Sequence, residues 1–191
     1  MLARNQYAQT EERNPIDCSL FYLALRKKNL LAGLWRSAGW HPEQPAMVKF
    51  LSHDFGDSRW RTAASKNAYA LLAKQRYGEM HLLISSNCQE YAAAFFILAD
   101  SLKDAVNVCL RNLNDLQLAV GIARAYEGDD GPILRYIIEE HVLPRAVSTG
   151  DRWLASWAFW MTGDRGKSVQ ALIVMPFFSL CTEISSCLWM I

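Results

Sequence analysis

The stretch YAAAFFILAD, Tyr91–Asp100, runs for nine residues without a charge before Asp100 closes it. A membrane-spanning helix needs about 20 consecutive apolar residues, so this stretch is too short to be one. A helix that is apolar on all sides is instead buried between other helices. Its alanines let neighbouring helices approach closely, while Tyr91, Phe95 and Phe96 fill the gaps. The stretch therefore predicts an inner helix of an all-α fold.

Signals for the start of a helix recur along the rest of the chain. Residues with a short oxygen-bearing side chain, or a proline, stand just before apolar residues at helical spacing, where they cap or open a helix. One of these helices is expected to run through CSLFYLALRKK, Cys18–Lys28, and another to end at Gly128. The expected starting residues are Asp17, Asp57, Ser101, Asn114, Pro132 and Asp151.

Two segments of the chain share a pattern that indicates stacked helical hairpins. Tyr91–Leu110 and Trp153–Leu172 each contain an uncharged helix, a polar turn and an amphipathic helix that ends in leucine. Short turns make consecutive helices neighbours in space, as in an α-solenoid. The aligned pairs are Ala93 with Ala155, Phe95 with Trp157, Leu98 with Trp160 and Leu110 with Leu172. The predicted fold is therefore an all-α fragment of a solenoid.

Composition excludes several classes of protein. With 51% hydrophobic residues the chain can build a core, and a formal net charge of +1 argues against a nucleic-acid surface. The five cysteines include no C-x-x-C pair, which predicts buried thiols and neither disulfides nor a zinc site. Residues 1–13 lack the apolar core of a signal peptide and are expected to be a disordered N-terminal segment.

No motif indicates an enzyme. The four histidines form no H-x-x-x-H pair, and the G-x-G-x-x-G, G-x-x-x-x-G-K-[ST] and G-x-S-x-G patterns are absent. The sequence GDRGKS, Gly163–Ser168, lacks the glycine spacing of a phosphate-binding loop and reads as a turn. We therefore expect no catalytic residue, no cofactor and no metal ion.

Two tryptophan-containing segments are candidates for binding partner proteins. Arg59 and Arg61 flank Trp60, and a basic helix with one tryptophan can also meet phosphates or anionic lipid. The alternative is a core tryptophan between solvated charges. Trp153 begins a run of three tryptophans at positions i, i+4 and i+7, which places them on one helical face for core or partner packing.

Two further segments break the helical pattern. Residues 78–89 are expected to form an inserted loop, and residues 174–191 an aberrant apolar tail without a cap or periodicity. Pro176 and Glu183 argue against a membrane span in the tail. Codons that these residues permit, for example at Gly78-Glu79, are compatible with retained intron sequence, which is our hypothesis for both segments.

At FLSHDFGDSRWRTAASKNAYALLAKQRY, Phe50–Tyr77, and EYAAAFFILADSLKDAVNVCLRNLNDLQLAVGIARAYEGDDGP, Glu90–Pro132, the chain resembles a known family. It is similar to the C-terminal helical region of the large subunit of the RAVE complex, the fungal relative of the Dmx-like and rabconnectin proteins. RWLASWAFWM, Arg152–Met161, and FYLALRKKNLLAGLWR, Phe21–Arg36, extend the resemblance over residues 14–173. Those residues are the predicted helical domain.

The resemblance implies a function without catalysis. The family promotes assembly of the peripheral and membrane sectors of the vacuolar proton ATPase, and its full-length members carry β-propellers that this chain lacks. It implies a cytoplasmic scaffold recruited to the vacuolar or endosomal membrane, peripheral to it at most, with other RAVE subunits and peripheral ATPase subunits as partners. A vesicle-coat or trafficking solenoid is the alternative. A nucleic-acid partner is not expected.

Overall fold

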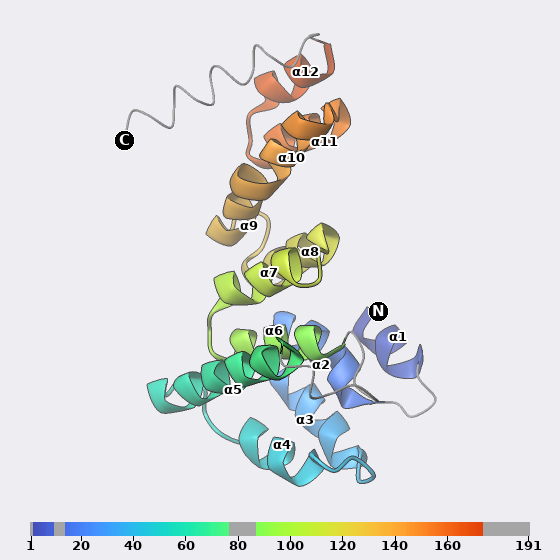
Figure 1. Cartoon of the computed structure of the whole chain (residues 1–191), viewed down its shortest axis with the longest axis vertical. Helices are drawn as coiled ribbons and strands as arrows, with labels where there is room; N and C mark the ends of the chain where they lie inside the picture. The colour runs from blue at the N-terminus through green and yellow to red at the C-terminus, as the bar shows by residue number, and fades with distance from the viewer. Residues whose placement is uncertain (1, 10–13, 77–86, 174–191) are drawn as a thin grey trace. The chain divides into compact units, whose positions relative to one another are not determined.

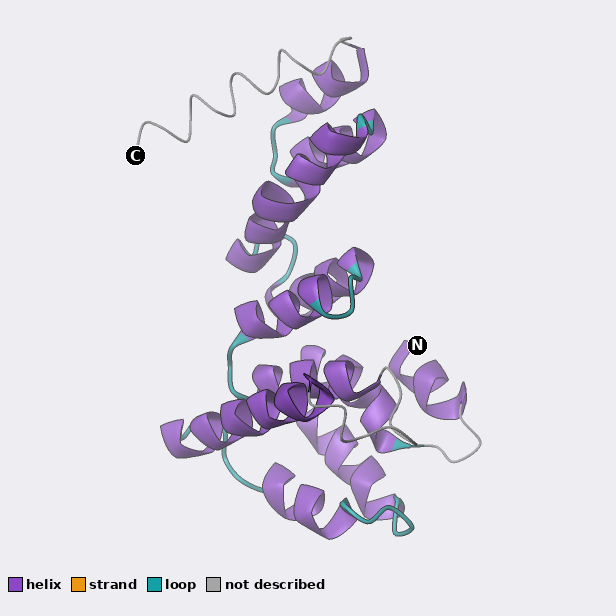
Figure 2. Ribbon diagram, in the orientation of Figure 1, coloured by secondary structure: helices purple, strands orange, loops and turns teal. Residues whose placement is uncertain are grey.

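The computed structural model describes residues 2–9, 14–76 and 87–173. All regular secondary structure in these residues is helical, as Figure 2 shows, so the predicted all-α fold is confirmed. The chain divides into two compact units, Met1–Gly128 and Asp129–Ile191.

The first unit contains helices α1 to α8, labelled in Figure 1. Consecutive helices pack against each other in the pairs α5–α6, α6–α7 and α7–α8, as the short connections predict. Helix α2 adds contacts with α6 and α8, which lie far from it in the sequence. The bounds are α1 Leu2–Gln9, α2 Pro15–Ala24, α3 Lys28–Ser37, α4 Gln44–Leu51, α5 Ser58–Arg76, α6 Asn87–Leu98, α7 Leu102–Arg111 and α8 Leu116–Glu127.

The second unit contains α9 Pro132–Ile137, a π-helical turn η1 Ile138–Val142, α10 Leu143–Thr149, α11 Arg152–Met161 and α12 Arg165–Ile173. The elements α9, η1 and α10 follow one another without a break. Pro144 near the start of α10 has no backbone N–H to donate to the preceding turn, and a local π-helical turn accommodates such a defect. Pro132 opens α9 as predicted.

Helix α6 is the centre of the first unit. Every residue from Tyr91 to Ala99 is buried, because α6 packs against α5, α2 and α7. Phe95 lies 5.7 Å from the ring of Phe50 on α4, and Phe96 meets Tyr69 of α5 edge-on at 5.0 Å. The prediction of an inner helix, buried on all sides, is confirmed.

Two of the predicted helix caps, at α5 and α11, are confirmed. Asp57 and Asp151 each accept a backbone N–H of their helix at 3.0 Å. Asn114 is not a cap, since its neighbour Asp115 accepts the N–H of Leu118 at 2.9 Å. Ser101 stands at the N-cap of α7 as predicted, but its side chain makes no capping hydrogen bond.

The start of α2 also differs from the prediction. Asn14 caps this helix by accepting the N–H of Ile16 at 3.0 Å, and Pro15 fixes its first residue. Asp17 therefore lies inside the first turn and is buried. The helix ends at Ala24 and does not continue to Lys28, because Arg26 turns into the left-handed region with φ of 57°.

The predicted boundaries of the flanking segments change at two places. The sequence predicts a disordered segment over residues 1–13. In the structure, Leu2–Gln9 form helix α1, which packs against α2. No proline or glycine interrupts these residues, so packing against α2 is enough to order them as a helix. Helix α6 starts at Asn87 and so takes the last three residues of the predicted loop 78–89. The rest of that loop and the tail 174–191 lie outside the described residues.

Buried thiols are confirmed for the three cysteines within the described residues, Cys18, Cys88 and Cys109, which are free. Burial raises the pKa of Cys18 and of Cys109 to about 12, so both stay protonated and unreactive at neutral pH. Cys181 and Cys187 lie outside the described residues.

Glu90, in the first turn of α6, makes the stability of the first unit depend on pH. Burial raises the pKa of its carboxyl, and the charges of Asp17 and Asp115 raise it further. The pKa of Glu90 is therefore higher in the folded protein than in the unfolded chain, where it is about 4.3. In this case Glu90 contributes its full stability below a pH of about 4.3, and that contribution is lost as the pH rises through the folded pKa. At pH 7 the charged Glu90 therefore costs folding free energy.

We expect Glu90→Gln to raise the free energy of unfolding at pH 7, with the gain shrinking as the pH falls through the raised pKa of the folded protein and gone below about 4.3, where Glu90 is protonated in both states. Denaturant unfolding of both proteins across this pH range measures the difference. Glu140→Gln on the exposed side of η1 is the control, with a change within about 0.5 kcal/mol. A gain at Glu90→Gln that did not vary with pH would contradict the assignment.

Candidate protein-interaction site

The N-terminal turn of α5 gathers three of the predicted site residues. The connection before it is built by Asp54, which accepts the N–H of Gly56 at 2.9 Å, and by Asp57, which caps the helix. This places Arg59, Trp60 and Arg61 at the beginning of α5, with Arg59 exposed and the other two half-buried.

Trp60 lies against an aromatic cluster, so it is neither a free surface tryptophan nor a fully buried one. The ring of His53 stacks on it with 3.4 Å between centroids and 9° between planes. Phe50 meets it edge-on at 6.4 Å. The Arg59 guanidinium lies 5.4 Å from the centre of the Trp60 ring, a distance at which a cation attracts the ring. Arg59 is thus the exposed residue of the three.

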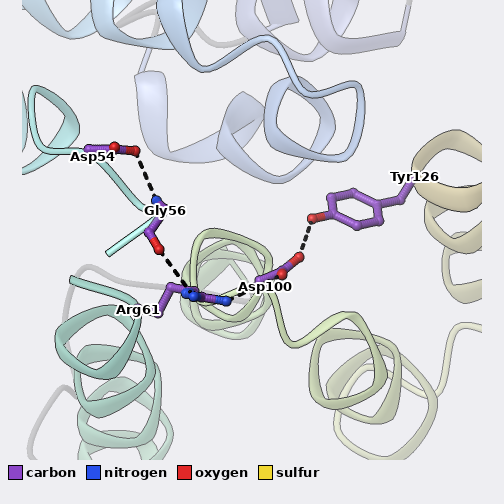
Figure 3. A network of polar contacts seen from close by, with 5 residues as sticks. All are labelled: Asp54, Gly56, Arg61, Asp100 and Tyr126. Carbon is purple, nitrogen blue, oxygen red and sulfur yellow. Dashed lines mark hydrogen bonds and ion pairs between the residues drawn. The ribbon is translucent and has the colours of Figure 1, made fainter. Parts of the chain in front are cut away.

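Arg61 is engaged within the chain, as Figure 3 shows. Its Nη2 donates to the carbonyl of Gly56 at 3.1 Å, and its Nη1 lies 3.6 Å from Oδ2 of Asp100. Asp100 also accepts the hydroxyl of Tyr126 at 2.9 Å. The exposed ion pair by itself adds little stability. Its effect is to connect the start of α5 with the α6–α7 turn and the end of α8.

Arg26 joins the same network from the end of α2. Its guanidinium lies 4.4 Å from the centre of the Tyr126 ring and donates to the Tyr126 carbonyl at 3.3 Å. We call Arg26, Arg61, Asp100 and Tyr126 the Tyr126 cluster. It brings together four parts of the first unit that are far apart in the sequence: the turns after α2 and α6, the first turn of α5 and the last turn of α8.

Two members of the Tyr126 cluster have left-handed backbone conformations. Arg26 has φ of 57° and Asp100 has φ of 60°, and both follow the last turn of a helix. A side chain in this conformation costs about 1 kcal/mol, so glycine is the usual residue. The second unit follows that usage, with Gly150 and Gly163 at positive φ after α10 and α11. At Arg26 and Asp100 the side chains are present despite the cost, and both contact Tyr126.

Sequence spacing could not reveal the Tyr126 cluster, because Arg26 and Tyr126 are 100 residues apart. The available signal was indirect. Helices α2 and α6 end without the glycine that follows α11, which indicates that another residue occupies the left-handed position.

Trp153 lies in the second unit, on α11, and is 78% exposed. Arg59, Trp60 and Arg61 therefore lie at the start of α5 in the first unit, and Trp153 lies on α11 in the second. Trp157 is half-buried and Trp160 is 57% exposed. The opposite face of α11, with Ala155 and Phe159, packs on Ala146 and Ala171 of the neighbouring helices. The tryptophan face is thus outside the core of its unit.

The Tyr126 hydroxyl reports on this cluster. Partial burial raises its pKa, and the hydrogen bond to Asp100 and the charge of Asp100 add to this, while Arg26 opposes it. We expect Asp100→Asn to move the Tyr126 titration down toward the ordinary value of about 10, as measured by ultraviolet difference absorbance.

Tyr126→Phe identifies the titration that belongs to this residue, because it removes the signal. In the parent protein the raised pKa contributes stability that is lost as pH rises through the folded value. An unchanged titration midpoint in Asp100→Asn would show that the hydrogen bond does not form.

Within the described residues, no group of three or more His, Cys, Asp or Glu side chains could hold a metal ion. No helix in the same part of the chain is both long enough and apolar enough to cross a membrane.

Comparison with known proteins decides the family. Residues 1–186 match the family described as RAVE protein 1 C terminal. The chain belongs to this family. The resemblance noted for residues 14–173 is therefore confirmed, and the match is wider at both ends, including residues 78–89 and 174–186.

Relatives of this RAVE family chain occur in fungi and mammals. It is 48% identical over 182 residues to "Regulator of V-ATPase in vacuolar membrane protein 1" of Schizosaccharomyces pombe, covering 95% of this chain and 13% of that protein. It is 43% identical to the protein of that name in Saccharomyces cerevisiae, covering 92% and 12%. Human DmX-like protein 1 is 38% identical over 178 residues, covering 86% and 5%. The chain thus spans a small part of each relative's length.

Proposed function

We propose that this chain is part of a non-catalytic helical scaffold that promotes assembly of the vacuolar-type proton ATPase through protein–protein contacts. The observation that carries the proposal is the 48% identity, over 95% of the chain, to a protein named as a regulator of V-ATPase in the vacuolar membrane. The partners are other RAVE subunits and peripheral ATPase subunits. The protein acts on the cytoplasmic side and is recruited to the vacuolar or endosomal membrane without spanning it.

The site geometry agrees with a binding role. Arg59 and Trp153 present a charge and an aromatic ring on helices whose opposite faces are packed, so their positions are set by rigid elements. Arginine and tryptophan are enriched among residues that dominate protein interfaces. A scaffold needs such surfaces and needs no reactive group.

Two measurements test the proposed function. A pull-down with the 191-residue chain should retain peripheral ATPase subunits or other RAVE subunits. In fungal cells lacking the full-length relative, the chain alone should fail to restore vacuolar acidification, because it spans 13% of such a protein. Retention of coat or trafficking proteins, without ATPase or RAVE subunits, would contradict the proposal. Full restoration of vacuolar pH would show that the chain is sufficient by itself.

Arg59→Glu tests whether the start of α5 meets the partner. Because Arg59 is exposed, we expect the free energy of unfolding to change by no more than about 0.5 kcal/mol. Association with the retained subunit should slow, and the effect should diminish at high salt. Lys66→Glu, an equal charge change at an exposed position of α5, is the control. Equal slowing by both variants would place the contact elsewhere.

A further inference from the structure

The exposed face of α11 is a large apolar surface. Trp153 and Trp160 are 78% and 57% exposed, and Trp157 between them is half-buried. Single exposed apolar side chains are ordinary, but several bulky ones on one helical face mark a binding surface. Ala155 and Phe159 supply core contacts of α11, whereas Trp153 and Trp160 lie outside that core.

Helix α12 carries further exposed apolar side chains. The turn between the helices is tight, since the N–H of Gly163 bonds to the carbonyl of Trp160 at 3.1 Å. Arg165, the first residue of α12, holds its guanidinium 5.5 Å from the centre of the Trp160 ring. From Arg165 the exposed residues Val169, Leu172 and Ile173 follow at helical spacing. We call Trp153, Trp157, Trp160, Val169, Leu172 and Ile173 the α11–α12 face.

The first unit shows what covers this kind of face. In the aligned hairpin α6–α7, the positions of Trp153, Trp157 and Trp160 are held by Tyr91, Phe95 and Leu98. All three are buried there. Phe50 of α4 lies 5.7 Å from Phe95, and the rings of Tyr91 and Phe95 on α6 itself meet at 4.9 Å. These positions of α6 are thus covered by neighbouring helices, of which α4 supplies an aromatic ring, whereas Trp153 and Trp160 on α11 are exposed.

The charge at the α11–α12 face indicates which side chains a binding partner would carry there. The charge placed at the face is that of Arg165, whose guanidinium lies beside the Trp160 ring, while the neighbouring Asp164 carboxylate lies 3.4 Å from Lys167. This cation favours an acidic side chain on whatever meets the face.

We infer that the α11–α12 face binds an acidic amphipathic helix of a partner protein. That helix carries aromatic or long aliphatic side chains at i, i+4 and i+7, which pack on the tryptophans, and an acidic residue beside them that meets Arg165. The inference rests on the proposed function, in which the partners are subunits that assemble with or within the ATPase, and it adds the surface and the chemistry of the contact.

Site-specific photocrosslinking tests the inference. The photoreactive amino acid p-benzoyl-phenylalanine replaces Trp153 or Trp160 in the 191-residue chain, expressed in fungal cells that contain the ATPase, and mass spectrometry identifies the crosslinked peptides. Trp40, 52% exposed in the first unit, is the matched control position. We expect both test positions to crosslink to one segment of another protein, with apolar residues at helical spacing and a net negative charge.

A synthetic peptide of that crosslinked segment then measures affinity. Trp153→Ala combined with Trp160→Ala should weaken binding at least tenfold, and Trp40→Ala less than twofold. Both variants should keep the helical circular dichroism of the parent, because the replaced side chains are exposed. Replacing the acids of the peptide by amides should weaken binding, most strongly at low salt.

The remaining outcomes overturn the inference. They are no crosslinking above that at position 40, crosslinks within the chain's own sequence, a crosslinked segment that is basic or lacks helical spacing, or equal affinity of the Trp153→Ala/Trp160→Ala and Trp40→Ala variants. The proposed function fails separately. A crosslinked acidic helix from a protein outside the ATPase and RAVE subunits keeps the surface and rejects the function. Retention of ATPase subunits without crosslinks from α11 would keep the proposed function and reject the α11–α12 face as the binding surface.

Discussion

Phe96→Ala should lower the free energy of unfolding by about 3–5 kcal/mol, the usual cost of truncating a buried phenylalanine to alanine. Phe96 is 1% exposed at the centre of α6, where Tyr69 of α5 meets its ring. The cost adds the lost burial of the ring to a cavity that the packed helices α2, α5 and α7 can close only in part. Denaturant unfolding followed by helical circular dichroism measures it.

Trp160→Ala is the matched control for Phe96→Ala. Although it also truncates an aromatic side chain, Trp160 is 57% exposed, so the change in the free energy of unfolding should be much smaller. Equal losses would mean that the α11–α12 face is part of a core, which would also count against its role in binding.

Ala93→Leu should destabilise the first unit by about 1–3 kcal/mol, although it adds apolar surface. Ala93 is fully buried on α6, where alanine lets the neighbouring helices approach, and the added methyl groups must displace them. The same change at the exposed Ala70 of α5 should have an effect within about 0.5 kcal/mol. Thermal or denaturant unfolding of both variants makes the comparison, and a stabilised Ala93→Leu would show that α6 has free space beside it.

The sequence was sufficient to predict features that depend on near neighbours. Helix α6 was identified because nine uncharged residues leave no side that could face water, and Asp57 and Asp151 because a capping carboxylate acts within three residues. The caps of α2 and α8 were placed wrongly. In both, two candidate residues stand close together, and the backbone conformation decides between them, as the φ of 52° at Asn114 illustrates.

Which face of α11 would be buried could not be predicted from spacing. This helix has one face of tryptophans and another of Ala155, Ala158 and Phe159, and both repeat with helical periodicity. The smaller residues form the core because they allow closer approach of the neighbouring helices. Among the predicted site residues, Arg61 donates to the nearby Gly56 and pairs with Asp100, and the second contact depends on the tertiary fold.

The contacts that α2 makes with α6 and α8 have a consequence for the order in which the first unit folds. In a linear repeat array each hairpin touches only its sequence neighbours, so folding can spread from any point. Here the end of α2 is held by Tyr126, the last residue but one of α8. Helix α2 is synthesised before α8, so its end cannot make its final contacts until Tyr126 has left the ribosome. Residues 14–128 should consequently gain stability in one late cooperative step, with the burial of α6 and the ordering of α2 completed together.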